Sequence, residues 1–331
     1  MKPLSSTSNF NIYLRRIAAF LVAFFALYSV ATLSAAALTD HFDDRNGTQK
    51  VTSYQIEDFY ALPEDSLDVL ILGSSHAMCT YDPAWIEHEF NLSAFNLGTA
   101  LQQPDTAYFL LKEALKTQKP KYLIYDVYFK VMLEEYSNDQ TVTVLKELKP
   151  SDNAIAMFWS NLVFEDKLSF YNNWLNPFGR IQSVMENGEK IEEKRADAYR
   201  GRGFYSTNGV VAPELLGEEK HPFSKEYSGF NARQVEYLKK LITLAQENGI
   251  EVILTNAPLP PTILSRIEYF DAILAESEAI ATIFDVPFYD FAIPCAEILS
   301  DTDFADQGHL NQAGSRKFME YFVSVMQELK K

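Results

Sequence analysis

The chain has 331 residues, with 29 Lys and Arg against 45 Asp and Glu, which gives a formal net charge of −16. This length fits one large domain or two small ones, and 47% hydrophobic residues supply a packed core, so wholesale disorder is excluded. The acidic balance argues against nucleic-acid binding, which needs clustered Lys and Arg. Five His and two Cys do not form the ligand cluster of a zinc site, so we expect no metal.

The first strongly apolar segment is residues 17–38, a run of 22 residues without a charged side chain. At 1.5 Å per residue, a helix of this length crosses a hydrocarbon core about 30 Å thick. Three basic residues precede the run and acidic ones follow it, so the positive-inside rule places residues 1–16 in the cytoplasm and the remainder outside. We expect an uncleaved signal anchor; the alternative is a signal peptide cleaved near residues 34–37 and a secreted protein.

Residues 39–66 are predicted to be a polar juxtamembrane linker, and residues 67–331 to be a folded domain. Short apolar runs in this domain are typical of strands buried on both faces. The predicted strands are residues 67–73, 95–98, 122–125, 251–255 and 287–290.

Segments with apolar residues every three or four positions lie between these strands and are typical of helices. Asp82 and Pro83 mark the start of one helix, and Gly249 marks the end of another. Residues 131–228 show no regular pattern and are interpreted as a long insertion with some helix. The predicted helices are residues 83–90, 105–117, 231–248, 263–284 and 311–329.

The alternation of short strands with helices indicates βαβ units. We therefore expect an α/β fold in which a doubly wound, mainly parallel sheet carries helices on both faces, giving three layers. In such folds the reactive groups lie beyond the carboxyl ends of the strands. Functional residues are therefore expected directly after the predicted strands.

Ser74 and Ser75 follow the first predicted strand, in the sequence Gly73-Ser74-Ser75-His76. A serine on a strand-to-helix turn exposes its hydroxyl, and the helix N-terminus stabilises developing negative charge. The simpler interpretation is that one of these serines only caps the helix.

Asp306 and His309 lie between the last predicted strand and the final predicted helix, three positions apart. In a helical turn this spacing puts both side chains on one face. The carboxylate then holds the imidazole in one tautomer while its other nitrogen acts as a general base. The alternative is that Asp306 caps a turn and His309 is an ordinary surface residue.

Together, Ser75 after the first strand, Gly98 after the second, and Asp306-x-x-His309 before the final helix resemble the SGNH/GDSL hydrolase superfamily. The resemblance implies a flavodoxin-like fold, a triad of Ser75, His309 and Asp306, and an oxyanion hole. The backbone N–H groups of Ser75 and Gly98 would form that hole. The asparagine that the superfamily places after the third strand is not found, and Asp126 stands in that region.

Within the superfamily the chain is similar to an extracytoplasmic branch that includes DltD and the alginate-acetylation proteins. The sequence Gly73-Ser74-Ser75-His76, the residues from Asp303 to Asn311 and the N-terminal apolar segment carry this similarity. The branch implies acyl chemistry on an envelope polysaccharide or a teichoic-type polymer, without a cofactor. It also implies that a multi-spanning membrane O-acyltransferase is a partner.

Further side chains are expected to line the site, namely Ser74, His76, Asp126, Asn256 and Asn311. His76 adjoins the proposed nucleophile, but neighbours on a turn usually point apart. We therefore expect His76 to face the substrate or to pack, and not to act as the base.

Cys79 lies four residues after Ser75, and Cys295 lies eleven residues before Asp306. If the two motifs converge in space, these thiols converge as well. A disulfide between them is permitted outside the cytoplasm, and two buried free thiols are the alternative.

The sequence therefore predicts a membrane-anchored serine esterase or O-acyltransferase that works through an acyl-enzyme. A non-catalytic SGNH-like domain that binds the polymer or the acyltransferase is one alternative, and the missing asparagine favours it. A phosphoester hydrolase on the same fold is the other, and it is disfavoured because no Lys/Arg cluster accompanies the motifs.

Overall fold

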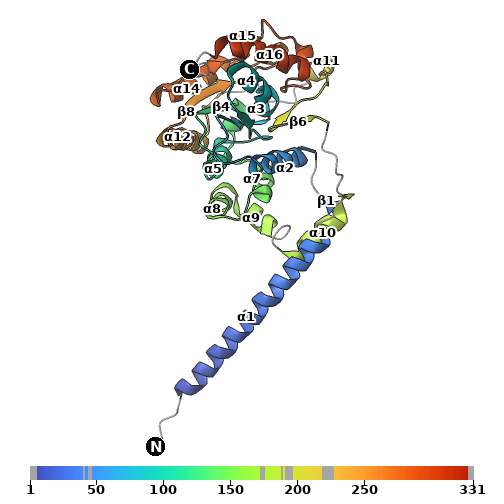
Figure 1. Cartoon of the computed structure of the whole chain (residues 1–331), viewed down its shortest axis with the longest axis vertical. Coiled ribbons are helices and arrows are strands. Elements are labelled where there is room, and N and C mark those ends of the chain that lie inside the picture. The colour runs from blue at the N-terminus through green and yellow to red at the C-terminus, as the bar shows by residue number, and fades with distance from the viewer. Residues whose placement is uncertain are drawn as a thin grey trace, which may run out of the picture. The chain divides into compact units, whose positions relative to one another are not determined.

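The computed structural model describes residues 6–39, 42–43, 47–171, 176–187, 189–190, 197–217 and 227–326 (Figure 1). The chain divides into two compact units. The first unit contains Met1–Arg45 and Phe164–Glu193, and the second contains Asn46–Val163 and Lys194–Lys331.

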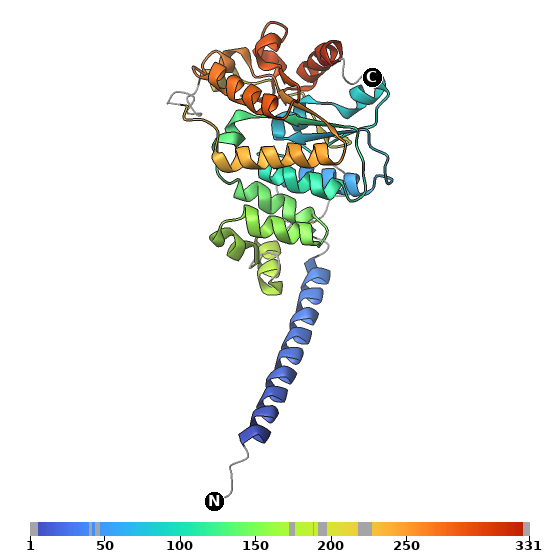
Figure 2. The ribbon, with the colours of Figure 1, turned by 90° about the vertical axis from the view of Figure 1, so that its left-hand side faces the viewer.

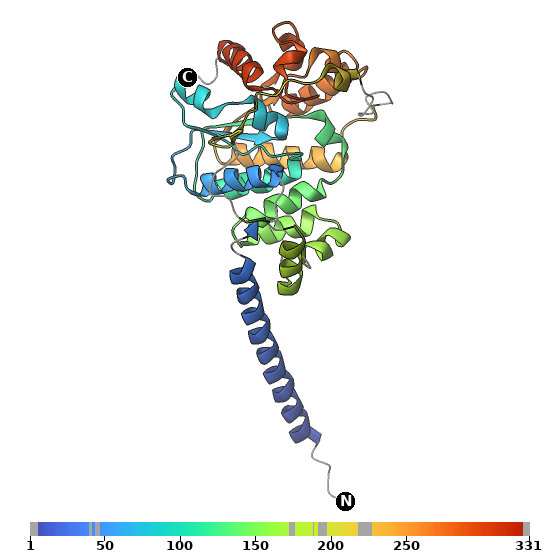
Figure 3. The same ribbon diagram turned by 90° about the vertical axis from the view of Figure 1, so that its right-hand side faces the viewer.

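The first unit is built around the long helix α1 (Ser6–Thr39), drawn in blue in Figures 1 and 3. Within it, Phe10–Ala35 is long and apolar enough to cross a membrane, and its most apolar stretch is not buried. The predicted span of residues 17–38 lies inside α1. The other elements of this unit are β1 (Phe42–Asp43), α9 (Phe164–Phe170), α10 (Pro177–Asn187) and β5 (Glu189–Lys190), of which β1 pairs antiparallel with β5.

The second unit contains a five-stranded sheet in the order β3-β2-β4-β8-β9, with every neighbouring pair parallel. The strands are β2 (Val69–Gly73), β3 (Ala94–Asn96), β4 (Tyr122–Asp126), β8 (Glu251–Asn256) and β9 (Phe288–Asp290). All residues of the first three strands are buried, which explains their continuous apolar sequences.

Helices cover both faces of this sheet, as Figure 2 shows. On one face lie α5 (Pro104–Ala114) and α12 (Ala232–Glu247), which pack against each other. On the other face lie α3 (Ser75–Thr80), α4 (Pro83–Phe90) and α16 (Gln312–Val325). The predicted α/β fold with a doubly wound parallel sheet in three layers is therefore confirmed.

Alternate side chains of the strands form the core on the α3/α4/α16 face. Val69 and Ile71 of β2 pack there with aromatic side chains of the helices. The fully buried aromatic residues of this cluster are Tyr81, Phe291, Phe304, Phe318 and Phe322.

Several helices begin or end at the capping residues that the sequence predicted. The side chain of Asp82 accepts the N–H of Ala84 at 2.9 Å, and Pro83 begins α4. Gly249 follows α12 with φ +74°, a conformation that favours glycine. The single helix predicted over residues 263–284 is instead two helices, α13 (Pro261–Leu264) and α14 (Phe270–Ile283), because tight turns at residues 265–269 interrupt it.

The remaining elements of this unit lie outside the main sheet and the helices named above. They are α2 (Gly47–Tyr60), α6 (Phe129–Leu133), α7 (Asn138–Glu147), α8 (Asp152–Asn161), β6 (Tyr199–Gly201), β7 (Phe204–Tyr205), α11 (Pro213–Gly217), α15 (Ala292–Cys295) and the 3-10 helix η2 (Asp301–Asp303).

Two predicted boundaries differ from the structure. The second unit begins at Asn46, before residue 67, because α2 buries Val51, Ile56 and Phe59. The predicted insertion of residues 131–228 is not one separate piece. Its α7 packs against α2 and its α8 packs against α5, whereas residues 164–193 belong to the first unit.

The hairpin formed by β6 and β7 is a separate two-stranded sheet that contacts the edge strand β3 of the main sheet. The backbone N–H of Asn96, in edge strand β3, donates to the carbonyl of Arg202 at 2.9 Å. Gly203 lies so close that a Cβ on it would be 1.6 Å from the Asn96 carbonyl oxygen. Gln55 of α2 donates to the carbonyls of Gly203 and Gly98, at 2.8 and 2.7 Å. A segment of the predicted insertion is thereby held beside the strand ends.

Candidate active site

Ser75 is the first residue of α3, directly beyond the carboxyl end of β2. The turn needs Gly73, whose φ is +141° and whose added Cβ would lie 2.9 Å from Cβ of Asp126. Ser74 is the N-cap: its Oγ accepts the N–H of His76 at 3.2 Å. Ser74 is buried and its hydroxyl is engaged in this cap. Of the two serines, only Ser75 presents its hydroxyl to the site.

The hydroxyl of Ser75 meets the imidazole of His309, although 234 positions separate the two residues. Ser75 Oγ and His309 Nε2 are 2.7 Å apart. The other ring nitrogen of His309, Nδ1, lies 2.8 and 2.9 Å from the two carboxylate oxygens of Asp306. The contacts from Ser75 to His309 and from His309 to Asp306, which the two motifs predicted, are therefore present in the structure.

A tight loop after η2 orients Asp306 and His309. The Oδ1 atom of Asp306 accepts the backbone N–H groups of Gly308 and His309, at 2.9 and 3.0 Å. The N–H of Ala305 donates to the carbonyl of His309 at 2.8 Å and closes the loop. Because the carboxylate is fixed by backbone donors, it presents its oxygens to the ring in one orientation.

The charge of Asp306 is also fixed. Partial burial raises the pKa of this carboxyl, but the hydrogen bond with His309, the charge that this ring carries when protonated and the two backbone donors outweigh burial and lower the pKa well below its usual value. Asp306 is therefore ionised at neutral pH. An ionised partner on Nδ1 leaves Nε2 of His309 free to accept the proton of Ser75.

The Ser75–His309 pair lines two pockets. The first pocket, of about 400 Å³, is mainly apolar and is lined by side chains that include Val51, Met78, Cys79 and Tyr205. The second pocket, of about 310 Å³, lies on the side of His76, Tyr128 and Lys130. Ser75, Leu101, Asp306 and His309 line both pockets.

His76 lies under the second pocket and is only 3% exposed. Its ring stacks on Tyr128, with ring centroids 3.7 Å apart, and its centroid is 5.1 Å from that of His309. Burial and the neighbouring charges of His309 and Lys130 hold the pKa of His76 well below its ordinary value. His76 is thus a neutral packing residue, and Ser75 bonds to His309 instead.

The predicted oxyanion hole needs a correction at Gly98. Its backbone N–H donates to Oδ1 of Asn96 at 2.9 Å, so this amide already has an acceptor. Asn96 is held in turn, because its Nδ2 donates to the carbonyls of Ala77 and Tyr81. Of the two predicted donors, the N–H of Ser75 remains, at the first position of α3, where a helix offers no internal acceptor.

Three of the predicted lining residues have structural partners and line neither pocket. Asp126 accepts the N–H of Ala257 at 2.7 Å, and burial raises its pKa to about 7. Asn256 donates to Asp290 at 2.8 Å. Asn311 is the N-cap of α16 and accepts the N–H of Gly314 at 3.0 Å. Their positions after strands or before a helix are explained by these bonds.

The possible disulfide between Cys79 and Cys295 is not formed: both cysteines are free and buried, which is the alternative that the sequence left open. Cys79 packs with Val51, Met78 and Tyr199 beside the first pocket. Cys295 belongs to the core of the sheet, with Phe291 and other residues. The Ser75 and Asp306 motifs converge, but the two thiols point into different clusters.

Several residues of the site had not been predicted, namely Val51, Leu101, Tyr128, Lys130 and Tyr205. Tyr128 and Lys130 follow β4, so the rule that sites form at strand ends points to them. Val51 and Tyr205 come from segments without a strand signal. In the part of the chain that the structure describes, no group of three or more His, Cys, Asp or Glu is placed to hold a metal ion.

Comparisons with known proteins give only distant likenesses. No family model matches the chain, and no curated protein matches it. Among solved structures, it is similar to a candidate acylhydrolase of Bacteroides fragilis, with 12% identity, a TM-score of 0.41, and coverage of 87% of this chain and 100% of the other. It is also similar to a GDSL-like lipase of Bacteroides thetaiotaomicron, with 12% identity, a TM-score of 0.40, and coverage of 86% and 98%.

Proposed function

We propose that the protein is an SGNH/GDSL-type serine hydrolase, an esterase or O-acyltransferase, that uses Ser75, His309 and Asp306 as its triad. The observation that carries the proposal is the continuous contact from Ser75 Oγ through the ring of His309 to the carboxylate of Asp306, at 2.7 and 2.8 Å. A nucleophile, a base in reach of it and a group that orients the base are the parts that acyl transfer through serine needs.

In the proposed reaction, His309 Nε2 takes the proton of Ser75 as Oγ attacks the carbonyl carbon of an acyl ester. The ionised carboxylate of Asp306 stabilises the imidazolium that forms. Collapse of the tetrahedral intermediate expels the alcohol, which takes the proton from His309, and leaves the acyl group on Ser75. Water or a sugar hydroxyl then attacks this acyl-enzyme, with His309 again acting as the base.

The oxyanion would be bound by the N–H of Ser75, because the N–H of Gly98 is engaged by Asn96. Removing one oxyanion donor typically costs about 10² to 10³ in rate. A slow enzyme is therefore expected. The same observation favours the second candidate function, a domain that binds the polymer or its acyltransferase without turnover.

We place this activity outside the cytoplasm, on acyl esters of an envelope polysaccharide or a teichoic-type polymer, beside a multi-spanning membrane O-acyltransferase. Support for the location is the helix Phe10–Ala35, which is long and apolar enough to span a membrane, with Arg15 and Arg16 near its N-terminal end. Support for the substrate class is the resemblance of the motifs to the extracytoplasmic branch.

Covalent labelling tests the nucleophile directly. The full chain in detergent is treated with a fluorophosphonate probe, and labelling is followed on a gel and by peptide mass. We expect labelling at Ser75, loss of it in Ser75→Ala, and a rate lowered by about 10³-fold or more in His309→Ala. Ser265→Ala, which changes an exposed serine after α13, is the control and should label normally.

Two outcomes would overturn the proposal. Equal labelling of the wild-type chain and of Ser75→Ala would refute the nucleophile. A folded wild-type chain that neither labels nor hydrolyses any aryl ester would leave the non-catalytic binding domain as the better interpretation.

A further inference from the structure

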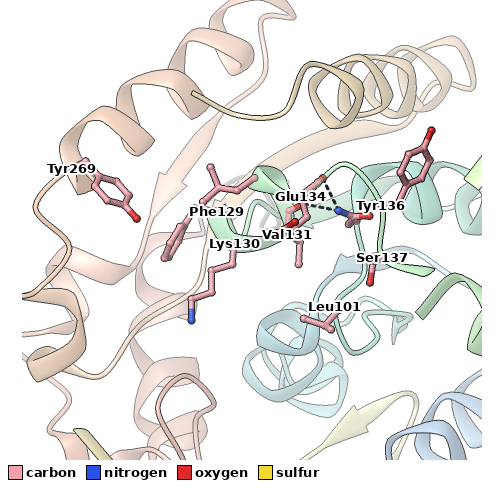
Figure 4. Close-up of a pocket in the computed structure, with 10 residues that line it drawn as sticks. Leu101, Phe129, Lys130, Val131, Glu134, Tyr136, Ser137 and Tyr269 are labelled. Atoms are coloured by element: carbon pink, nitrogen blue, oxygen red, sulfur yellow. Dashed lines mark hydrogen bonds between the residues drawn. The ribbon is translucent and has the colours of Figure 1, made fainter. Parts of the chain in front are cut away.

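A third pocket lies next to the proposed active site. It has a volume of about 420 Å³, and its walls include Phe129, Lys130, Tyr136 and Tyr269 (Figure 4). It does not reach Ser75 itself. It shares Leu101 and Lys130 with the second pocket, however, and that pocket is lined by Ser75 and His309. The third pocket therefore adjoins the second, and the nucleophile lines both the first and the second pocket.

Leu101 lines all three pockets, and its backbone is unusual. Its φ is +53°, in the left-handed region that a leucine rarely adopts, and its side chain is 55% exposed. The flanking residues hold it there. Gln102 accepts the N–H of Gly73 at 3.0 Å, and Gln103 donates to the carbonyls of Val131 and Glu134 at 3.0 and 2.8 Å (dashed lines in Figure 4). Strain of this kind is typical of functional sites.

The lining of the first pocket differs in charge from that of the second and third pockets. No Lys or Arg is among the residues that line the first pocket. Lys130 lines the second and third pockets and is the only Lys or Arg among their lining residues. Glu134 lines the third pocket only, and it is an exposed residue. A single cation therefore stands at the junction of the second and third pockets, in a chain whose net charge is −16.

Lys130 is half-buried, and Figure 4 shows its side chain extended away from α6, beside Phe129. Burial lowers the pKa of its ammonium group to about 8, so the group remains mainly charged at neutral pH. A ligand anion that reaches this ammonium group can form a charge-assisted hydrogen bond with it.

We infer that Lys130 and the third pocket form a subsite for an anionic group, a carboxylate or a phosphate, carried on the alcohol side of the ester. This inference rests on the proposed function for its link to catalysis. The first pocket has no Lys or Arg in its lining, so we assign the neutral acyl group to it and the alcohol to the second pocket. His309, which returns the proton to the leaving alcohol, also lines that second pocket.

Three model esters test the inference in steady-state kinetics. They are 4-acetoxybenzoate, 4-acetoxyphenyl phosphate and the neutral 4-acetoxybenzamide, which differ only in the group that would reach Lys130. In Lys130→Met we expect KM to rise about 10-fold or more for the anionic esters, with kcat little changed and the amide unaffected. Lys130→Arg should retain most of the preference. Whichever anion loses more in Lys130→Met identifies the preferred group.

Lys119→Met is the matched control. Lys119 precedes β4, at the opposite end of that strand from the site, and pairs with Asp65 on the surface. This variant should leave all three KM values unchanged. If Lys130→Met raises KM equally for the charged and the neutral esters, the side chain has only a packing role and the inference is wrong.

A binding measurement separates the subsite from the proposed catalysis. Calorimetry with Ser75→Ala, which cannot turn over, uses 4-hydroxybenzoate and phenyl phosphate as probes. We expect saturable binding that weakens about 10-fold or more in the double variant Ser75→Ala/Lys130→Met. This result would support the subsite even if no esterase activity were found. Equal affinity in both variants, or no binding in either, would overturn it.

Discussion

The imidazole of His76 occupies the space beside Gly308: a Cβ added to Gly308 would lie 2.9 Å from Nε2 of His76. Gly308 stands between Asp306 and His309 in the loop that carries both. His76 is fixed from its other face by the stack on Tyr128. The buried, neutral ring of His76 therefore packs against the loop that carries Asp306 and His309.

This relationship predicts that Gly308→Ala lowers activity without unfolding the chain. The added methyl group must displace the loop or His76 by a few tenths of an ångström, and small misplacements of catalytic groups cost up to about 10²-fold. We expect kcat/KM for an aryl ester, and the rate of fluorophosphonate labelling, to fall by about 10- to 100-fold.

Gly209→Ala is the control for this variant, because its added Cβ would meet only ordinary contacts at 3.6 to 3.8 Å. It should keep activity within about twofold of the wild-type chain. A fully active Gly308→Ala would show that the loop does not depend on His76.

The parts of this site that could be predicted are those that depend on short segments of sequence. The apolar runs that became β2, β4 and β8 are continuous because these strands are buried on both faces. Parallel strands bring their carboxyl ends to one edge, so Ser75 and the segment after β9 were expected to converge. The strand-end rule pointed to Ser75, whereas Asp306 and His309 were assigned from the combination of motifs and not from the rule alone.

The rest depends on contacts between segments that are remote in sequence. The sequence Asn96-Leu97-Gly98 does not show whether the backbone N–H of Gly98 points to a substrate or to the side chain of Asn96. The hydrogen bond between Gly98 and Asn96 could therefore not be predicted. Tyr205 reaches the first pocket only because its hairpin docks on β3. The α2 helix has a mixed polar and apolar sequence and was predicted to be a linker, but it is buried by tertiary packing.

The docking of that hairpin gives a second prediction. In Gly203→Ala the new Cβ would overlap the backbone oxygen of Asn96, at 1.6 Å, which no side-chain movement relieves. We expect the free energy of unfolding to fall by about 3 kcal/mol or more. Esterase activity should fall with it, because Tyr205 leaves the first pocket. Chemical denaturation and kcat/KM measure the two effects.

Gly201→Ala separates backbone strain from overlap. Gly201 also has a positive φ, +86°, but its added Cβ would meet nothing within 4 Å. The expected loss is the strain alone, about 1 to 2 kcal/mol. If Gly203→Ala were no more destabilising than Gly201→Ala, the close contact between the hairpin and β3 would be refuted.

The state of the two cysteines gives a third prediction. The chain purified without reductant should release two thiols when denatured, because Cys79 and Cys295 are free. In the native chain both should react slowly with a thiol reagent, since burial raises the pKa of Cys295 to about 12 and that of Cys79 further. Cys295→Ala should leave one thiol. A count of zero in the denatured wild-type chain would show a disulfide instead.

The buried carboxyl of Asp126 gives the last prediction, which concerns stability against pH. Burial raises its pKa to about 7, although the N–H of Ala257 and the hydroxyl of Tyr81 act in the opposite direction. In the unfolded chain the pKa has its usual value of about 3.9. Between about pH 4 and pH 7, the folded chain therefore holds a proton that the unfolded chain has lost.

By linkage, folding stability from this group must fall as pH rises through that range. Below about pH 4 both states are protonated and the group has no effect. Above about pH 7 the folded state has to bury a charge. Asp126→Asn stays neutral at every pH and retains an oxygen for Ala257 and Tyr81. We expect it to match the wild-type stability near pH 4 and to exceed it near pH 8, by at most about 4 kcal/mol.

Denaturation of both chains across pH 4 to 8 measures the difference. Asp285→Asn is the control, because Asp285 is exposed and its φ of +52° suits asparagine as well as aspartate. Its difference from wild type should not vary with pH. A pH-independent difference between Asp126→Asn and wild type would mean that Asp126 is already ionised in the folded chain at pH 4, and that the polar groups around it stabilise the charge.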